Sequence, residues 1–179
     1  MGDKVKCYFG CGHIDKHDEG YINVDIRPAP HVDVQCDLSK TLPLEDEYAD
    51  EIVAHSLLEH FPMGDYVHDD RPYANTVRIL KEWLRVLKVG GTLELKVPNI
   101  EGLAENYTKN GIERIEFFRY LYGGQNYPEN THLAGFDRAI LHLCLQLAGF
   151  SEFYFMHSHD DNGVFEPKKD WELRVRAKK

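Results

Sequence analysis

Small and acidic residues recur at four places where short apolar runs of the chain end. Gly10-Cys11-Gly12 follows the first run, Asp25 the second, Asp37 the third, and the segment from His55 to His60 the fourth. In an open α/β sheet, ligands bind beyond the carboxyl ends of the strands, near the point where strand order reverses. Because all four motifs stand at predicted strand ends, we expect one ligand to lie across them.

Each motif has residue types that suit part of a nucleoside-like ligand. Gly10 and Gly12 permit a sharp turn and a close approach of the backbone to a ligand. An ionised Asp25 only accepts hydrogen bonds, which suits two vicinal ribose hydroxyls, and Asp37 can accept from the exocyclic amine of an adenine ring. Taken singly, a GxG is also an ordinary tight turn and an Asp an ordinary strand end. The order of the motifs favours the ligand.

The stretch after Gly12 indicates what kind of ligand this is. A dinucleotide site needs a glycine-rich turn that leads straight into a helix N-terminus. The residues from His13 to Gly20 are charged and lack apolar periodicity, so they cannot supply a normal helix. We therefore expect a phosphate-free ligand, which disfavours the alternative of a nicotinamide-dependent oxidoreductase.

The elements that must position these motifs alternate along the chain. Apolar runs predict strands at about 5–9, 21–26, 32–36, 50–55, 92–97, 150–156 and 171–176. Helical spacing predicts helices at 77–87, 112–122 and 136–148, the first ended by Gly90-Gly91 and the last by Gly149. The alternation predicts a single α/β domain over residues 1–179, with 99–135 as a lid or insert. The two final strands predict one antiparallel pair on an otherwise parallel sheet.

Composition and charge argue against several classes of protein. The chain has 179 residues and a net charge of −9, which suits one globular core and argues against nucleic-acid binding. No apolar run approaches the roughly 20 residues of a membrane span, and no secretory leader pattern is present. The four cysteines form no CxxC pair, so we expect reduced thiols and a cytoplasmic location.

The motifs follow the order seen in one known family. Over roughly residues 5 to 156, Gly10-Cys11-Gly12, Gly20 to Asp25, Asp37-Leu38, Leu57 to Phe61 and Leu84 to Gly91 together resemble the S-adenosylmethionine-dependent methyltransferases of class I. The resemblance implies a Rossmann-like three-layer α/β sandwich with a seven-stranded, mostly parallel sheet and an antiparallel last strand. The first helix after the first strand is expected to be shortened or absent.

The resemblance also implies the cofactor and its site. S-adenosylmethionine would be the methyl donor and S-adenosylhomocysteine the product. The residues expected to bind it are Gly10, Cys11, Gly12, Asp25, Ile26, Asp37, Leu38, His55, Ser56 and Leu57. Two positions depart from the family's pattern: Ile14 stands where a third glycine is usual, and Val89 where a proline is usual.

Candidate catalytic residues follow from what a methyl acceptor needs. A hydroxyl acceptor calls for a general base, and neutral histidine suits that role. Glu59 and His60 come directly after the fourth predicted strand, and His132 lies in a polar loop before the last helix. The structural alternative is that Glu59 pairs locally and His60 packs beside Phe61.

The ten histidines also raise the question of a metal. Cys7, Cys11, His13 and His17 have suggestive spacing, as does the segment 157–161. However, no CxxC pair or His-x3-His knuckle occurs, and Cys7 and Cys11 belong to the first strand and its turn. We therefore expect no metal site.

These observations together predict a methyltransferase acting at oxygen or nitrogen of a small-molecule or glycan-like acceptor. The acceptor itself and the oligomeric state are not predicted. The alternative is a non-catalytic binding or scaffold module of the same fold, which the missing helix after Gly12 motivates.

Overall fold

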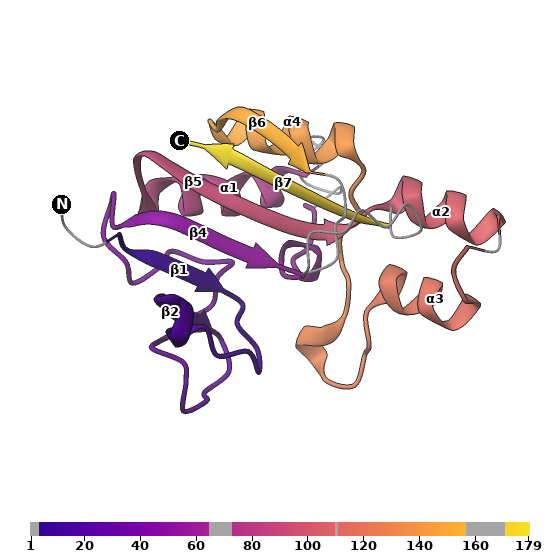
Figure 1. Cartoon of the computed structure of the whole chain (residues 1–179), viewed down its shortest axis with the longest axis horizontal. Helices are drawn as coiled ribbons and strands as arrows, with labels where there is room; N and C mark the ends of the chain where they lie inside the picture. The colour runs from indigo at the N-terminus through magenta and orange to yellow at the C-terminus, as the bar shows by residue number, and fades with distance from the viewer. Residues whose placement is uncertain (1–3, 65–72, 110, 157–170) are drawn as a thin grey trace.

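A single seven-stranded sheet organises the chain (Figure 1). The computed structural model describes residues 4–64, 73–109, 111–156 and 171–179. The strands are β1 (Lys6–Phe9), β2 (Tyr21–Asp25), β3 (Val34–Gln35), β4 (Ala49–His55), β5 (Leu87–Pro98), β6 (Ser151–Met156) and β7 (Glu172–Lys178). Their order is β3-β2-β1-β4-β5-β7-β6. β7 is antiparallel to both neighbours and the other pairings are parallel, so the predicted sheet is confirmed.

Strand order reverses between β1 and β4. The chain runs outward from β1 through β2 to β3 and then returns to place β4 on the other side of β1. Phe9 is in register with Val24 of β2 and with Ala54 of β4. The residues that follow these three strands therefore meet at one edge, where ligands of α/β sheets bind.

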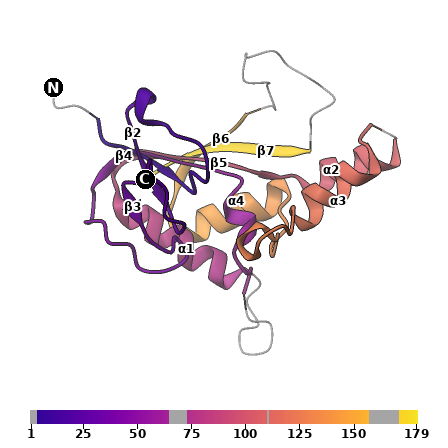
Figure 2. The same cartoon turned by 90° about the horizontal axis from the view of Figure 1, so that it is seen from below.

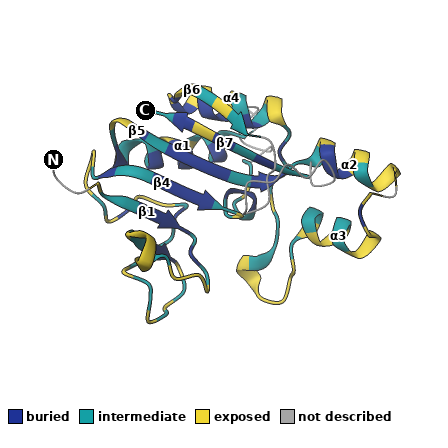
Figure 3. Ribbon diagram, in the orientation of Figure 1, coloured by how far each residue is buried: buried dark blue, intermediate teal, exposed yellow. Residues whose placement is uncertain are grey.

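Two amphipathic helices cover one face of the sheet (Figure 2). These are α1 (Ala74–Val86) and α4 (Arg138–Ala148), and they pack against each other as well as against the strands. Figure 3 shows the buried positions running along the central strands. The shared core includes Phe9, Ile52, Leu93, Leu95 and Val175 of the sheet, Leu80 and Trp83 of α1, and Leu141 and Leu145 of α4. Full burial of each such side chain contributes about 1.5–3 kcal/mol.

The opposite face of the sheet carries a small hydrophobic cluster of Tyr8, Cys11 and Val53 and, toward β7, a group of charged side chains, for which we call it the polar face. No α-helix of the described ranges lies over it (Figures 1 and 2). As expected, the helix after β1 is reduced, here to one 3-10 turn, η1 (His17–Glu19). Glu94 lies on this face, buried under Arg174 and Arg176, whose side chains donate to its carboxylate. Two arginine side chains thus cover Glu94, in the place that an α-helix would take on the other face of the sheet.

The end of α1 differs from the prediction. The helix ends at Val86, and β5 begins at Leu87, so Gly90 and Gly91 lie inside the strand rather than at a helix end. Leu87 is buried and paired with Ala49 of β4, and this pairing holds the chain extended from that point. A Cβ on Gly91 would come within 2.9 Å of the backbone oxygen of Lys88. Glycine is therefore needed at this position because the backbone passes close by, and not because a helix ends there.

A pair of helices extends beyond the carboxyl end of β5 (Figure 1). α2 (Ile100–Thr108) was not predicted, because only Gly102 and Leu103 of it are buried and its apolar periodicity is weak. α3 (Arg114–Tyr122) falls within the predicted 112–122 and has no buried residue. The two helices meet through Tyr107 and Phe117, whose ring centroids are 4.4 Å apart. Part of the aromatic content therefore forms a small cluster of its own.

The loop after α3 contains one 3-10 turn, η3 (Pro128–Asn130), and another, η2 (Leu58–His60), follows β4. No helix in the described ranges has the length and apolar character needed to cross a membrane. All four cysteines are free thiols.

Candidate active site

A pocket of about 640 Å³ opens at the carboxyl ends of β1, β2 and β4. Its wall includes every residue that the sequence singled out for cofactor binding or catalysis. These are Gly10, Cys11, Gly12, Asp25, Ile26, Asp37, Leu38, His55, Ser56, Leu57, Glu59, His60 and His132. The structure therefore brings all of them to one cavity.

The turn after β1 has the backbone conformation that glycine permits. Gly10 and Gly12 have φ values of +70° and +60°, a region that side chains disfavour. A Cβ on Gly10 would lie 2.7 Å from the side chain of Leu57. The amide of Gly10 donates to the carbonyl of Val24 at 2.8 Å. The turn is thus fastened to the end of β2 and packed against the segment after β4.

Asp25 links the end of β2 to this turn. Its side chain is buried, and Oδ2 accepts from the Gly12 amide at 2.7 Å. Oδ1 accepts from the amide of Arg27 at 2.9 Å, and the Arg27 Nε lies 3.6 Å away. A carboxylate offers about four lone-pair positions, so both oxygens keep capacity for a ligand's hydroxyls. The geometry suits the role that its position predicts.

Asp37 is already engaged locally. Its Oδ1 accepts from the backbone amide of Ser39 at 2.9 Å and from the Ser39 hydroxyl at 2.6 Å. Leu38 beside it is buried, and its carbonyl accepts from Trp83 Nε1 at 3.0 Å. Asp37 therefore stabilises the turn after β3, and it also lies on the pocket wall.

The segment after β4 combines strain with a polar anchor. Ser56 has φ +51°, an uncommon conformation for a residue with a side chain. His55 turns toward the polar face of the sheet, where its Nε2 lies 3.0 Å from Oε1 of Glu94. This contact holds β4 and β5 together just below the pocket. The hydrogen bond to Glu94 thus fixes the position of His55 on the pocket wall.

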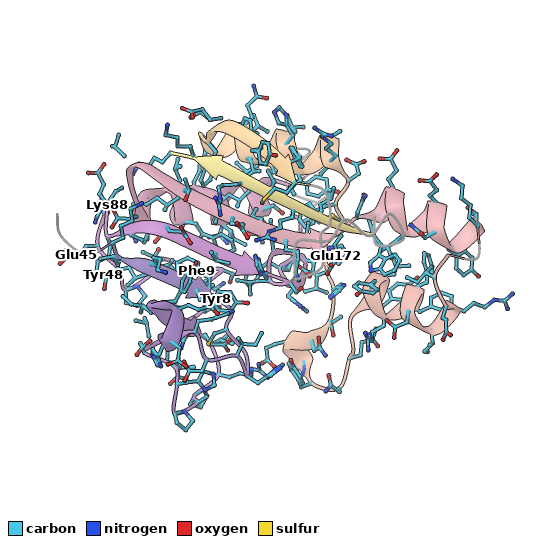
Figure 4. All side chains as sticks on the ribbon, in the orientation of Figure 1. Tyr8, Phe9, Glu45, Tyr48, Lys88 and Glu172 are labelled. Carbon is cyan, nitrogen blue, oxygen red and sulfur yellow. The ribbon has the colours of Figure 1, made fainter. Side chains whose placement is uncertain are left out.

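Glu59 is the most unusual side chain of the site. Glu59 is only 1% exposed, and neither of its carboxylate oxygens has a hydrogen-bond partner among the described residues. Burial raises the pKa of Glu59 to about 8, and the nearby carboxylate of Glu172 acts in the same direction. Figure 4 shows Glu172 at the start of β7, beside the segment that follows β4. A buried carboxyl without a partner carries a substantial desolvation cost.

His60 and His132 face each other beside Glu59. Their ring centroids are 4.7 Å apart. Nδ1 of His60 donates to the carbonyl of Thr131 at 3.1 Å, and Nδ1 of His132 donates to that of Tyr120 at 2.8 Å. Burial lowers the pKa of both imidazoles. Both rings are therefore neutral near pH 7, with Nε2 as the nitrogen that keeps its lone pair.

Backbone hydrogen bonds hold this group together across more than seventy residues of sequence. The carbonyl of Glu59 accepts from the amides of Leu133 and Ala134 at 2.8 and 3.0 Å. The amide of His132 donates to the carbonyl of Tyr122 at 3.1 Å. The loop after α3 is thereby fastened to η2, which fixes where His132 lies.

Sequence reasoning missed other residues of the pocket wall, including Arg27, Arg119 and Glu172. The guanidinium of Arg27 lies 4.7 Å from the ring centroid of Tyr127, so the loop after β2 meets the loop after α3 across the pocket. Proximity to Asp25 could have pointed to Arg27. No local signal marks Glu172, because β7 reaches the pocket only through the antiparallel return of the chain.

Comparison with known proteins agrees with this architecture. Residues 15–95 match a family model described as a methyltransferase domain. A search of curated proteins finds no match. Among solved structures, an S-adenosylmethionine-dependent methyltransferase from Thermotoga maritima is similar over 100% of this chain and 84% of its own, with 22% identity and a TM-score of 0.59.

Two further structures show the same likeness. A methyltransferase of the same kind from Methanosarcina mazei has 20% identity and a TM-score of 0.60, over 100% of this chain and 93% of its own. Human N-acetylserotonin methyltransferase, solved in complex with S-adenosylmethionine, has 14% identity and a TM-score of 0.58, over 98% of this chain and 47% of its own. Identities this low show the fold. Together with the match over residues 15–95, they show that the chain has the fold of class I methyltransferases.

Proposed function

We propose that this domain binds S-adenosylmethionine in the pocket after β1, β2 and β4 and transfers its methyl group to a small acceptor. The convergence of the strand-end residues on one cavity carries the proposal. The turn of Gly10 to Gly12 would hold the methionine part of the cofactor, Asp25 the ribose, and Asp37 with Leu38 the adenine.

The bound cofactor supplies an electrophilic methyl group, so the protein's main task is to position an acceptor in line with it. Glu59, His60 and His132 form the wall on the acceptor side. A neutral imidazole within reach of the acceptor can take its proton. We therefore favour transfer to a hydroxyl or amine. The pocket has the size of a small-molecule site, which supports a small-molecule or glycan-like acceptor.

The proposal is tested by calorimetric titration with S-adenosylhomocysteine, the demethylated cofactor. Asp25→Asn should weaken binding by roughly 10- to 100-fold, because a hydrogen bond to a charged group contributes about 1.5–3 kcal/mol. Asp50→Asn is the matched control. Asp50 is also an ion-paired aspartate, bonded to Lys88 at 2.6 Å, but it lies at the other end of β4 and is not part of the pocket wall.

Absence of binding by the unmodified protein at millimolar cofactor would refute the proposal. Equal loss in both variants would assign the effect to folding instead. Consumption of the methyl donor with a panel of small hydroxyl and amine acceptors separates the enzyme from the alternative of a non-catalytic module, which would bind the cofactor without turnover.

A further inference from the structure

The carboxylate of Glu59 lacks the partner that buried charges normally have. Its two oxygens accept no hydrogen bond from the described residues, although the residue is almost completely buried. Lys96 is the cation whose charge acts on Glu59, but its Nζ is paired with Glu172 at 3.7 Å. Buried charges in proteins are usually paired or bound to a metal ion. The Glu59 carboxyl is therefore buried without an ion-pair partner among the described residues.

Two imidazole nitrogens point to the same place. One oxygen of Glu59 and one ring nitrogen from each of His60 and His132 all lie within 4.8 Å of one another. Both histidines donate Nδ1–H to backbone carbonyls. Metal-binding histidines typically donate their other ring nitrogen in this way, which fixes the tautomer and leaves Nε2 as the ligand.

We propose that Glu59, His60 and His132 bind a divalent transition-metal ion on the acceptor side of the pocket. Two imidazoles and one carboxylate suit zinc, iron, cobalt or manganese better than magnesium or calcium, which prefer oxygen ligands. Metal–ligand bonds of about 2.0–2.2 Å require the three atoms to lie somewhat closer than 4.8 Å. Side-chain rotations that move each atom by about 1 Å are sufficient.

The site has a functional consequence that rests on the proposed function. Three protein ligands leave positions on the ion open to the pocket, as in catalytic metal sites. An oxygen atom of the acceptor would occupy one of them. This assigns the acceptor an oxygen donor near the atom to be methylated, and it departs from the sequence-based expectation of no metal. That expectation considered only ligands close in sequence.

The metal ions alone are the probe. Untagged protein is treated with a chelator, dialysed, and titrated calorimetrically with zinc, cobalt and manganese chlorides. We expect one saturable site per chain. Cobalt should also give the visible absorption of a nitrogen- and oxygen-ligated ion. The variants Glu59→Gln, His60→Asn and His132→Asn should each weaken binding at least tenfold, because each removes or replaces a ligand.

His13→Asn is the matched control. His13 is an exposed histidine on the wall of the same pocket but is not one of the three ligands, so its replacement should leave metal affinity unchanged. Glu59→Gln keeps the size of the side chain and adds no charge to its buried position, so this variant should fold. Its melting temperature should no longer rise when metal is added, unlike that of the unmodified protein.

The inference is overturned if the unmodified protein shows no saturable site, or if His13→Asn weakens binding as much as the ligand variants do. Titration of the same sample with S-adenosylhomocysteine separates the two proposals. Cofactor binding without metal binding refutes the metal site alone. Metal binding without cofactor binding refutes the proposed function, and then the metal site stands without the role in acceptor binding.

Discussion

Replacing Glu94 tests whether the polar face of the sheet stabilises the fold. Glu94 is 3% exposed and accepts from His55 at 3.0 Å, from Arg174 Nε at 2.8 Å and Nη2 at 2.5 Å, and from Arg176 at 2.7 Å. Burial alone would raise the pKa of this carboxyl. The hydrogen bonds from His55, Arg174 and Arg176, together with the charge of Arg174, outweigh burial and lower the pKa to about 2.

The size of the effect follows from the shift of the pKa. The difference between the ordinary value of 4.5 and about 2 corresponds to about 3 kcal/mol at 1.36 kcal/mol per unit. Because the folded-state pKa is lowered, this stability is present above pH 4.5 and is lost as the pH falls toward 2. Glu94→Gln should therefore lower the free energy of unfolding at pH 7 by about 2–3 kcal/mol, or roughly 5–10 °C in melting temperature.

Urea unfolding at pH 7 and at pH 2.5 measures this change. Glu152→Gln is the control, because Glu152 of β6 pairs with Lys178 of β7 but its side chain is 67% exposed. An exposed pair contributes no more than about 1 kcal/mol. The reasoning fails if Glu94→Gln unfolds at the same urea concentration as the unmodified protein at pH 7. It also fails if the difference persists undiminished at pH 2.5.

Three further predictions concern the pocket and its supporting helix. Gly10→Ala should lower stability by at least about 1 kcal/mol and weaken binding of S-adenosylhomocysteine. The reason is that φ of Gly10 is +70° and the new Cβ would lie 2.7 Å from the Leu57 side chain. Thermal unfolding measures the stability and calorimetry the binding. In metal-free protein, the raised pKa of Glu59 makes stability fall as the pH rises from about 4.5 to about 8; Glu59→Gln should abolish this slope in urea unfolding. Asp137→Ala removes the side chain that accepts from the amide of Ile140 at 2.7 Å and should lower stability by about 1 kcal/mol without changing cofactor affinity.

Each of these predictions has a result that contradicts it. Unchanged binding by Gly10→Ala would mean that the turn does not approach the ligand closely. A pH slope that survives in Glu59→Gln would assign it to another group. A loss of cofactor affinity in Asp137→Ala would show that the start of α4 affects the pocket.

Local patterns predicted that the residues after β1, β2 and β4 would line one pocket, because strand ends and topology are linked. Apolar runs identified β1, β2 and β4, and parallel strands bring their carboxyl ends to one edge. The sequence therefore sufficed to predict that Gly10 and Asp25 lie close together, although it reveals no side-chain contacts. The sequence-based prediction of the end of α1 was wrong, because that end depends on a contact between segments far apart in the sequence. Pairing of Leu87 with Ala49 decides where the helix stops, and that pairing is not local.

The sequence by itself determined the order of the motifs at the strand ends and the lack of a normal helix after Gly12. It also determined which residue types lie on the pocket wall. Only the tertiary structure decided how Glu59, His60 and His132 come together. His132 reaches His60 because the loop after α3 donates two backbone hydrogen bonds to Glu59. The unpaired state of the Glu59 carboxylate also depends on everything packed around it. Such contacts between distant segments leave no spacing in the sequence from which they could be predicted.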